Sequence, residues 1–250
     1  MSELKNNIIA IASGKGGVGK TWLAVTLAHL FARSGRHVLL FDGDIGLANV
    51  DVQLGLTPQR DLSSMLSGRH TLKEAITNYP EGGFDIIAGR SGSASLAALP
   101  VEKLEHMAAD LQELRKNYDF VVIDLGAGIE QHVQYLASLA HRCIVVVTDE
   151  PTSLTDAYAF IKIANTGKNP PEMCVVVNQA ATQREGEMTY NAINKACVNF
   201  LNLSPPLLGI IRRDNKVKDA IRSQKSLLIK APHSTAATDA AVLSIKLMQR

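Results

Sequence analysis

The sequence contains few cysteines, and they are not arranged as a metal site. Only three of its 250 residues are cysteine, at positions 143, 174 and 197, and no two of them form a C-x-x-C pair. Cys143 and Cys174 lie beside or within apolar, strand-like runs. We therefore expect buried free thiols in a reducing cytoplasm.

Long apolar runs and strong net charge are also absent. No stretch approaches the roughly 20 apolar residues that a membrane-spanning helix needs, and residues 1–7 are polar, unlike the start of a signal peptide. Net charge is +2 and the isoelectric point is about 8.4, which is too weakly basic to predict nucleic-acid binding. We expect a soluble cytoplasmic protein that can still contact a membrane surface.

The composition that is present favours one folded domain. Hydrophobic residues make up 46% of the chain and charged residues 20%, which is enough for one sizeable core and unlike a disordered sequence. The sequence shows no internal repeat and no low-complexity linker, and residues 89–95 are best interpreted as a surface loop. We predict a single domain spanning residues 1–250.

Short apolar segments alternate with longer amphipathic ones. We predict strands at residues 8–12, 37–41, 84–88, 120–123, 143–148, 174–177 and 207–211, and helices at 21–33, 101–115, 154–164 and 188–201. This alternation indicates an α/β fold with a mostly parallel sheet. The strands at 120–123 and 143–148 are continuously apolar, so helices should cover both faces of the sheet.

A glycine-rich segment separates the first predicted strand from the first predicted helix. Residues 14–21, GKGGVGKT, fit the phosphate-loop pattern G-x-x-x-x-G-K-[ST] in the context that this motif requires. Its backbone N–H groups and the helix N-terminus form an anion cradle, Lys20 reaches the β- and γ-phosphates, and Thr21 can ligate Mg²⁺. The candidate phosphate-binding residues are Gly14, Lys15, Gly16, Gly17, Val18, Gly19, Lys20 and Thr21.

Three carboxylates follow predicted strands. Asp42 and Asp44 end the second strand, and Asp124 follows the strand at 120–123. Acidic side chains at the carboxyl ends of such strands point into the crevice where ligands bind. Close carboxylates need a cation to offset their repulsion, so we predict that Mg²⁺ binds here, with Asp124 holding it through a coordinated water. The alternative for Asp42 and Asp44 is a polar turn.

The string KGGVGKT resembles the deviant Walker A signature of the MinD/ParA ATPases. This resemblance implies a P-loop ATPase fold, with ATP or ADP and Mg²⁺ as cofactors, and an ATP-dependent homodimer. It also implies that Lys15 crosses the dimer interface to stabilise charge on the partner's nucleotide, as a catalytic residue alongside Lys20. The alternative for Lys15 is a solvated loop charge.

The same resemblance assigns further roles. Asp44 would position or activate the attacking water, and Asp42 would support Mg²⁺ and its waters. Asn178 would contact adenine, and residues 211–214, IRRD, would wrap the base through Arg213 and Asp214. Helix caps or turns are the alternative for Asn178 and Asp214. Trp22 is a candidate nucleotide contact, although we favour a place in the core.

Two longer strings resemble the flagellar-number branch of this group, called FlhG or FleN. They are DGDIGLANVDVQLGL at residues 42–56 and DEPTSLTDAYAFIKI at residues 149–163. The resemblance implies ATP-driven dimerisation, control of flagellar number or placement, and location at the inner face of the membrane or the cell pole. Its implied partners are a signal-recognition-type GTPase, a basal-body component or a transcriptional activator.

Some segments depart from this branch. Leu125 and Gly126 replace a small polar residue and a proline in the switch segment, and flexible Gly126 could alter how the switch senses the γ-phosphate. The branch often carries an N-terminal segment that stimulates the GTPase, for which the strand starting at Ile8 leaves no room. It also carries a C-terminal membrane helix, whereas we expect residues 235–250 to form a helix packed on the sheet.

Two other functions remain open. Basic residues at positions 212–230 favour a ParA-type ATPase that binds DNA and positions another cargo, although a solvated helical face is the preferred interpretation. The altered switch favours a nucleotide-binding adaptor with little hydrolysis. A metabolic enzyme is disfavoured because the scattered histidines, such as His29, His37 and His132, form no second catalytic cluster.

Overall fold

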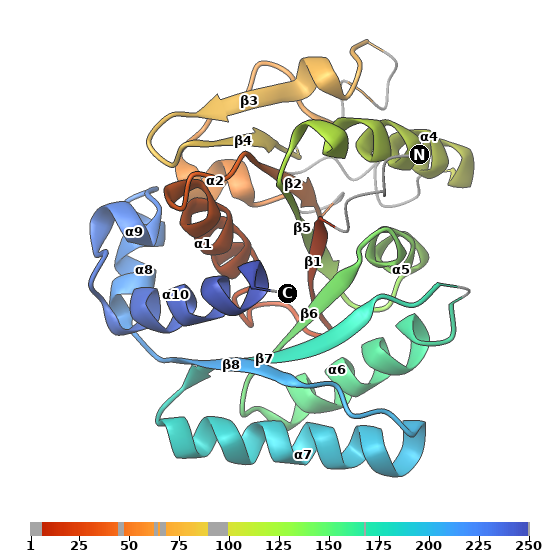
Figure 1. The fold of residues 1–250 in the computed structure, drawn as a ribbon, viewed down its shortest axis with the longest axis vertical. Coiled ribbons are helices and arrows are strands. Elements are labelled where there is room, and N and C mark those ends of the chain that lie inside the picture. Colours follow the sequence, from red (N-terminus) through yellow and green to blue (C-terminus); the bar gives the residue numbers. More distant parts are fainter. Residues whose placement is uncertain are drawn as a thin grey trace.

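One eight-stranded sheet organises the protein. The computed structural model describes residues 7–44, 48–62, 65, 69–89, 100–167 and 169–249. The strand order is β3-β4-β2-β5-β1-β6-β7-β8 (Figure 1). The strands are β1 (Ile8–Ser13), β2 (Val38–Gly43), β3 (Ile76–Tyr79), β4 (Phe84–Ile87), β5 (Phe120–Ala127), β6 (Arg142–Val147), β7 (Glu172–Ala180) and β8 (Leu207–Arg212). All seven predicted strands are present, and the predicted loop at 89–95 lies outside the described residues except for Gly89.

The sheet is parallel apart from its β3 edge. β3 pairs with β4 in antiparallel register, from Ile76 opposite Ile87 to Tyr79 opposite Phe84. The connecting residues 80–83 end on Gly83, whose φ of 69° suits glycine. The sequence analysis missed β3 because its four residues carry too short an apolar pattern to show periodicity. The paired glycines before Phe84 are the hairpin signal that was available.

Helices cover both faces of the sheet, as predicted (Figure 1). One face carries α1 (Lys20–Arg33), α2 (Val50–Leu54), α8 (Asn215–Arg222), α9 (Leu227–Lys230) and α10 (Thr235–Met248). The other carries α4 (Val101–Leu114), α5 (Gln131–Ser138), α6 (Pro151–Ala164) and α7 (Gln183–Leu201). Two short 3₁₀ turns complete the described elements, η1 (Lys73–Ala75) and η3 (Arg115–Asn117).

Each face has its own hydrophobic core. Ile8 and Ala10 of β1 contribute to the core under α4 to α7, whereas Ile9 and Ile11 contribute to the core under α1 and α10. Successive strand residues point to opposite faces, so a central strand must be apolar at every position to satisfy both cores. The polar residues at the strand ends are therefore the exception in these strands.

Helix α7 begins five residues before the predicted start at Met188. Thr182 caps it, because its hydroxyl accepts a hydrogen bond from the Glu185 N–H at 3.1 Å. Thr182 and Glu185 stand in the spacing of a capping box, which marks a helix N-terminus. The apolar periodicity that guided the prediction starts later than this polar first turn.

The last helix packs on the sheet, as expected. Leu243 of α10 is buried, and a Cβ built on Gly209 of β8 would lie 2.3 Å from its Cδ2 atom. The guanidinium of Arg212 forms two hydrogen bonds with the carboxylate of Asp239, which ties α10 to the end of β8. Among the described residues, no helix combines the length and apolar character needed to cross a bilayer.

The packing of α10 predicts different costs for two neighbouring substitutions. Leu243→Ala should lower the free energy of unfolding by about 2–4 kcal/mol, because it opens a cavity in the core. Val242 is 50% exposed, so Val242→Ala should change it by no more than about 0.5 kcal/mol. Urea unfolding of both variants measures the difference. Equal losses would show that α10 is not held through this face.

Candidate nucleotide-binding site

Close backbone approaches shape the phosphate loop. Gly17 and Gly19 have φ values of 80° and 96°, which L-residues with side chains rarely adopt. A Cβ on Gly14 would lie 2.1 Å from the backbone carbonyl carbon of Asp156 in α6, and one on Gly19 would lie 2.4 Å from the Asn178 amide nitrogen. The loop therefore needs glycine at these positions, and it curls between β1 and α1 with its N–H groups available to an anion.

Lys20 lies at the start of α1 and is nearly fully buried. Its ammonium donates a hydrogen bond to Ser13 Oγ at 2.9 Å, and Ser13 in turn donates to the carbonyl of Lys15 at 2.6 Å. Burial lowers the pKa of Lys20, and the nearby charges of Asp124 and Asp44 act against that decrease. The ammonium thus lies beside the Ser13 hydroxyl and near the carboxylates of Asp124 and Asp44, where a phosphate anion would give it a further partner.

Asp42 and Asp124 are adjacent on neighbouring strands. They face each other in the register of β2 and β5, and both are fully buried. Burial raises the pKa of both carboxyl groups, and the charge of Asp124 raises that of Asp42 further. Two buried carboxyl groups at paired positions of neighbouring strands favour the binding of a proton or a cation between them.

Asp42 holds the backbone that follows β2. Its Oδ1 accepts from the Asp44 N–H at 3.2 Å, and its Oδ2 accepts from the N–H groups of Asn49 and Val50 at 3.2 and 3.1 Å. These bonds fix the start of α2 and the position of Asp44. The structure therefore gives Asp42 a supporting role, and its predicted contact with Mg²⁺ and its waters stays a prediction.

The carboxylate of Asp124 can accept a further partner. Burial raises its pKa to about 7, and a hydrogen bond from Thr21 and the charge of Lys20 act in the opposite direction. Within the described part of the chain, its Oδ1 atom has no hydrogen-bond partner. An orphaned buried carboxylate oxygen next to the Thr21 hydroxyl fits a hard cation with its water shell.

A site made of protein ligands alone is not present in the described residues, since no three His, Cys, Asp or Glu side chains come together there. Mg²⁺ keeps several waters and binds through one or two protein ligands plus phosphate oxygens. Thr21 and Asp124 match that requirement when a phosphate lies in the loop.

Asp44 lies beside the segment that departs from the flagellar branch. A Cβ on Gly126 would lie 3.4 Å from Asp44 Oδ1, in ordinary contact. Leu125 and Gly126 belong to β5, and both are buried. The predicted effect of Gly126 on sensing of the γ-phosphate stays a prediction. The turn follows at Gly128, whose φ is 106° and whose N–H donates to the Ser13 carbonyl at 3.1 Å.

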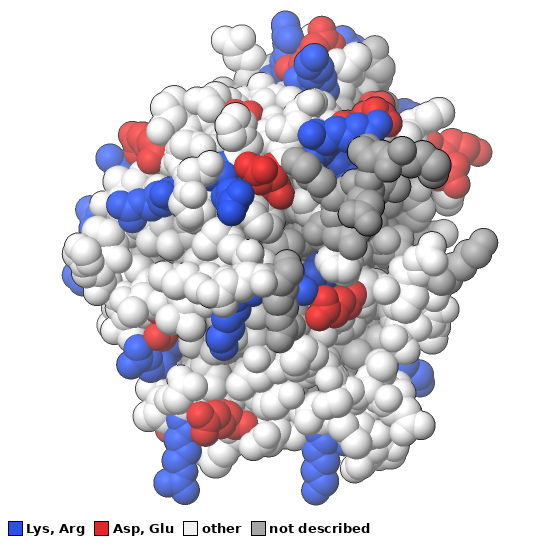
Figure 2. Space-filling view, viewed as in Figure 1, with Lys and Arg blue, Asp and Glu red and all other residues white. Residues whose placement is uncertain are grey.

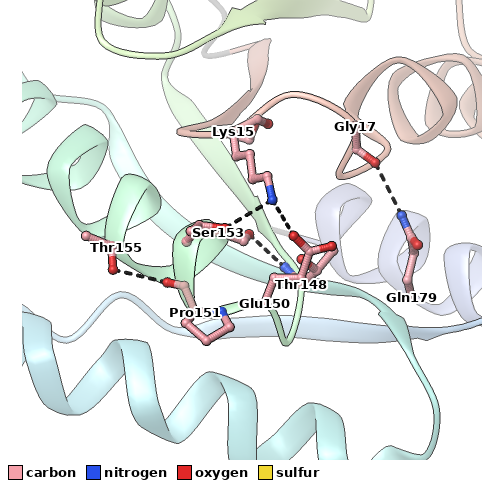
Figure 3. Close-up of polar contacts among 10 residues, drawn as sticks. Lys15, Gly17, Thr148, Glu150, Pro151, Ser153, Thr155 and Gln179 are labelled. Carbon is pink, nitrogen blue, oxygen red and sulfur yellow. Dashed lines mark hydrogen bonds and ion pairs between the residues drawn. The ribbon is translucent and has the colours of Figure 1, made fainter.

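Asn178 ties β7 to the phosphate loop. Its Nδ2 donates to the Val18 carbonyl at 2.7 Å, and its Oδ1 accepts from the Gln179 N–H at 2.9 Å. Gln179, which the sequence analysis missed, has a φ of 59° and donates from Nε2 to the Gly17 carbonyl at 3.4 Å (Figure 3). Asn178 therefore lies in a strand and holds the phosphate loop, and its adenine contact stays a prediction.

A pocket of about 300 Å³ opens next to the loop. It brings together Gly17, Trp22 and Asn178 with the segment after β8. Trp22 belongs to the core under α1, as we favoured, and it also lines this pocket. Its contact with a nucleotide stays a prediction. The remaining lining residues are Gly19, Gln179, Ile211, Arg212, Arg213, Asp214, Asn215, Val217, Lys218 and Ile221.

Asp214 lines the pocket, but its carboxylate oxygens hold two helices. Oδ1 accepts from the Lys216 N–H at 2.9 Å as the cap of α8, and Oδ2 accepts from the Ala236 N–H at 3.1 Å in α10. Partial burial raises its pKa, yet these hydrogen bonds outweigh it and leave the pKa below its usual range. The cap proposed as the alternative is present, while Arg213 is held through its backbone N–H to the Ala180 carbonyl at 2.8 Å.

Lys15 lies on the outer side of the loop. Its ammonium forms an ion pair with Glu150 and donates to Thr152 Oγ1 at 3.0 Å (Figure 3). The Lys15 side chain is 37% exposed and that of Glu150 is 59% exposed. The sequence analysis missed both partners. The Glu-Pro pair at 150–151 was the available signal, because proline favours the first position of a helix.

The charges do not form one basic surface on the face in view. Figure 2 shows Lys and Arg side chains interspersed with Asp and Glu over that face. Arg212, the first residue of the basic run, is neutralised by Asp239. The DNA-binding alternative for the rest of this run stays a prediction.

The burial of Asp124 predicts a pH dependence in the nucleotide-free protein without divalent cations. Its pKa is higher in the folded state, so the folded state binds more protons and the free energy of unfolding falls as pH rises from about 4 to about 7. Asp124→Asn should remove roughly 1–4 kcal/mol of that fall. Urea unfolding across this range measures it.

Asp110→Asn, on the exposed surface of α4, is the control and should follow the wild-type profile. Parallel pH profiles of the wild type and Asp124→Asn would show that, without a cation, the Asp124 carboxyl ionises as readily in the folded state as in the unfolded state.

Comparison with known proteins identifies the family of the chain. The profile of the CobQ/CobB/MinD/ParA nucleotide binding domain matches residues 9–228. The antiactivator FleN of Pseudomonas aeruginosa is 38% identical over 229 residues, which cover 92% of the chain and 81% of FleN. The flagellum site-determining protein YlxH of Helicobacter pylori is 35% identical over 226 residues, covering 90% of the chain and 76% of YlxH.

A solved structure shares the fold. The septum site-determining protein MinD of Pyrococcus horikoshii, complexed with Mg-ADP, matches with a TM-score of 0.82 and 24% identity, covering 96% of the chain and 95% of that protein. The predicted α/β architecture is thus confirmed. The matching profile and the two flagellar relatives show that the chain belongs to the CobQ/CobB/MinD/ParA nucleotide-binding family.

Proposed function

We propose that the protein is a nucleotide-driven switch that regulates the number or placement of flagella. It binds ATP with Mg²⁺, forms a homodimer in the ATP state and returns to the monomer after hydrolysis to ADP and phosphate. The observation that carries this proposal is the opposite placement of two loop lysines. Lys20 is buried against Ser13, whereas Lys15 lies on the outer side of the loop and is partly exposed.

Nucleotide binding rests on the phosphate loop. The N–H groups of residues 14–19 and the N-terminus of α1 bind the phosphates, and Lys20 neutralises the β- and γ-phosphates. The phosphate charge stabilises the ammonium that burial disfavours. The base would enter the pocket beside Trp22, next to the segment that contains Arg213 and Asp214.

Thr21 and Asp124 would hold Mg²⁺ together with the phosphates, with Asp42 supporting the arrangement through the backbone of Asp44. When bound, the cation neutralises charge that develops on the phosphate oxygens. The orphaned oxygen of Asp124 then gains a partner.

Hydrolysis needs a positioned water and a cation beside the γ-phosphate. Asp44 follows β2 close to Lys20 and Asp124, where its carboxylate can orient the attacking water. The Lys15 ammonium contacts Glu150 and Thr152, whereas the Lys20 ammonium is buried against Ser13, so Lys15 would serve the nucleotide of a partner subunit. Turnover would then depend on dimerisation.

The flagellar role rests on the relatives. One is named an antiactivator and the other a flagellum site-determining protein. We infer partners of the same kinds, namely a transcriptional activator, a signal-recognition-type GTPase or a basal-body component. The protein would work in the cytoplasm, with peripheral contact at the inner face of the membrane or the cell pole.

The switch predicts a nucleotide-dependent mass. With Mg²⁺, we expect a monomer with ADP and a dimer with ATP or a non-hydrolysable analogue, measured by light scattering after size exclusion. Lys15→Ala should keep ADP affinity within about threefold, stay monomeric with the analogue and lose at least tenfold in turnover.

Lys116→Ala is the matched control, because Lys116 also forms an exposed ion pair, with Glu113. It should behave as the wild type. A wild-type mass that ignores the nucleotide, or unchanged turnover in Lys15→Ala, would contradict the switch.

The flagellar assignment predicts a cellular effect of the same residue. Replacing Lys15 by Ala in the chromosomal gene should change the number or position of flagella per cell, counted by electron microscopy. Protein abundance is checked by immunoblot, because lost protein would give a similar effect. Normal flagella alongside a defect in distributing another cargo would reject the flagellar role in favour of a positioning ATPase of the ParA type.

A further inference from the structure

We propose that Asp239 is a positioning residue for the nucleobase, because it fixes the wall of the pocket against which the base would pack. This inference rests on the function proposed above, which places the base in the pocket beside Trp22. The wall segment, residues 211–215, spans the end of β8 and the start of α8 and lines one side of the pocket. Within the described chain, α10 contributes no residue to the pocket lining, so Asp239 would act on the base through the wall segment.

The sheet holds the wall segment less regularly than it holds the central strands. The register of β7 and β8 shifts between Val177 and Ala180, where Gln179 has a φ of 59°. Such an irregularity interrupts the ladder of backbone hydrogen bonds between neighbouring strands. Beyond it, the Arg213 N–H donates to the Ala180 carbonyl at 2.8 Å. The position of the wall segment therefore depends also on contacts from outside the sheet.

The carboxylate of Asp239 holds both the backbone and the side chain of Arg212. Its Oδ2 accepts from the Arg212 N–H at 3.0 Å and from Nε at 3.0 Å, and its Oδ1 accepts from Nη2 at 2.8 Å. The two guanidinium bonds have the paired geometry in which arginine binds a carboxylate most specifically. Because the backbone N–H is held as well, the contact fixes the path of the chain at the pocket.

A second contact joins the wall segment to the same helix. Asp214 Oδ2 accepts from the N–H of Ala236, in the first turn of α10, at 3.1 Å. An N–H group in the first turn has no partner within its own helix, so a carboxylate is favourable there. Ala236 and Asp239 are three positions apart and share one face of α10. This helix therefore holds the wall segment at two points.

The two sides of the pocket have separate supports. α10 lies along β8, with Leu243 buried close to Gly209 (Figure 1). The phosphate loop, on the other side, is held from β7 through Asn178 and Gln179. Loss of Asp239 should therefore loosen the wall segment and leave the phosphate loop in place. The base-dependent part of nucleotide affinity should fall, and the phosphate-dependent part should not.

The experiment compares Asp239→Ala, Arg212→Ala and the double variant with the wild type. Calorimetry with Mg²⁺ measures affinity for ADP and for pyrophosphate, which carries two phosphates without a base. Asp239→Ala removes all three hydrogen bonds and should weaken ADP binding by about 5- to 20-fold. Arg212→Ala keeps the backbone bond to Asp239, so it should weaken ADP binding by only about 2- to 5-fold.

The double variant separates positioning from charge. It has the net charge of the wild type, so its pyrophosphate affinity should stay within about twofold of the wild-type value. Its ADP affinity should equal that of Asp239→Ala, because the contact that Arg212 makes is already lost there. Arg212→Ala and its comparison with the wild type still test the inference if Asp239→Ala does not fold.

Glu172→Ala is the matched control. The carboxylate of Glu172 accepts two hydrogen bonds from the guanidinium of Arg142, at the opposite ends of the strands from the pocket. Its loss breaks a comparable ion pair without touching the wall segment. Both affinities should match those of the wild type.

A second readout follows the wall segment directly. Base packing should stabilise it, so ADP should slow hydrogen exchange at the N–H groups of Arg212 and Ala236 in the wild type, measured by NMR. Pyrophosphate should leave these two exchange rates unchanged, because it does not reach the wall segment. Equal slowing by both ligands would contradict the separate supports.

The affinities also distinguish failure of the inference from failure of the proposed function. Wild-type ADP affinity in Asp239→Ala would overturn the inference, as would an equal loss for ADP and pyrophosphate or a similar loss in Glu172→Ala. If the wild type binds pyrophosphate as tightly as ADP, the base does not use this pocket, and the inference fails while phosphate binding stands. If the wild type binds neither ligand, the proposed function fails and the inference fails with it.

Discussion

The burial of Asp42 against Asp124 is the constraint on which the site depends. Two carboxyl groups at the ends of neighbouring central strands, with Lys20 beside them, raise each other's cost of ionisation. Asp42 accepts hydrogen bonds from three backbone N–H groups, which stabilise its charged form. One oxygen of Asp124 has no partner in the described structure. The buried Asp124 oxygen thus lacks a positive partner and the buried Lys20 ammonium lacks a negative one, and a cation bound together with a phosphate can supply both.

The surrounding hydrophobic cores hold these buried carboxyl groups in place. β1, β2 and β5 are apolar on both faces, so they cannot shift without exposing two hydrophobic cores. That rigidity fixes the carboxyl ends of the strands, and the loop, α1 and the turn after β2 start from them. The hydrogen bonds of Asp42 extend the order to Asp44, so a residue in the core determines where the proposed water-positioning carboxylate lies.

The sequence predicted what local patterns encode. The central strands, the phosphate loop and the covering helices follow from apolar periodicity and glycine spacing, which are properties of neighbouring residues. Partners of polar groups follow from packing between distant segments and were missed. Asn178 donates to Val18, 160 positions away, and Lys15 pairs with Glu150, 135 positions away. The acceptors of Asp214, which we predicted at the base, serve the N–H groups of Lys216 in α8 and Ala236 in α10.

The two loop lysines divide binding from switching. Burial lowers the pKa of Lys20, so an anion in the loop would stabilise its ammonium, and in the proposed switch this makes nucleotide affinity a property of the single subunit. Lys15 is solvated and satisfied by Glu150 and Thr152, so nucleotide in the same subunit offers it little gain. In the proposed dimer, the phosphates bound by the second subunit would be the anion that competes with Glu150 for Lys15. In the proposed switch, a loop with one lysine on each side would let a single subunit bind ATP through Lys20, while Lys15 would act only in the dimer. Nucleotide binding and dimer assembly would then be separate steps.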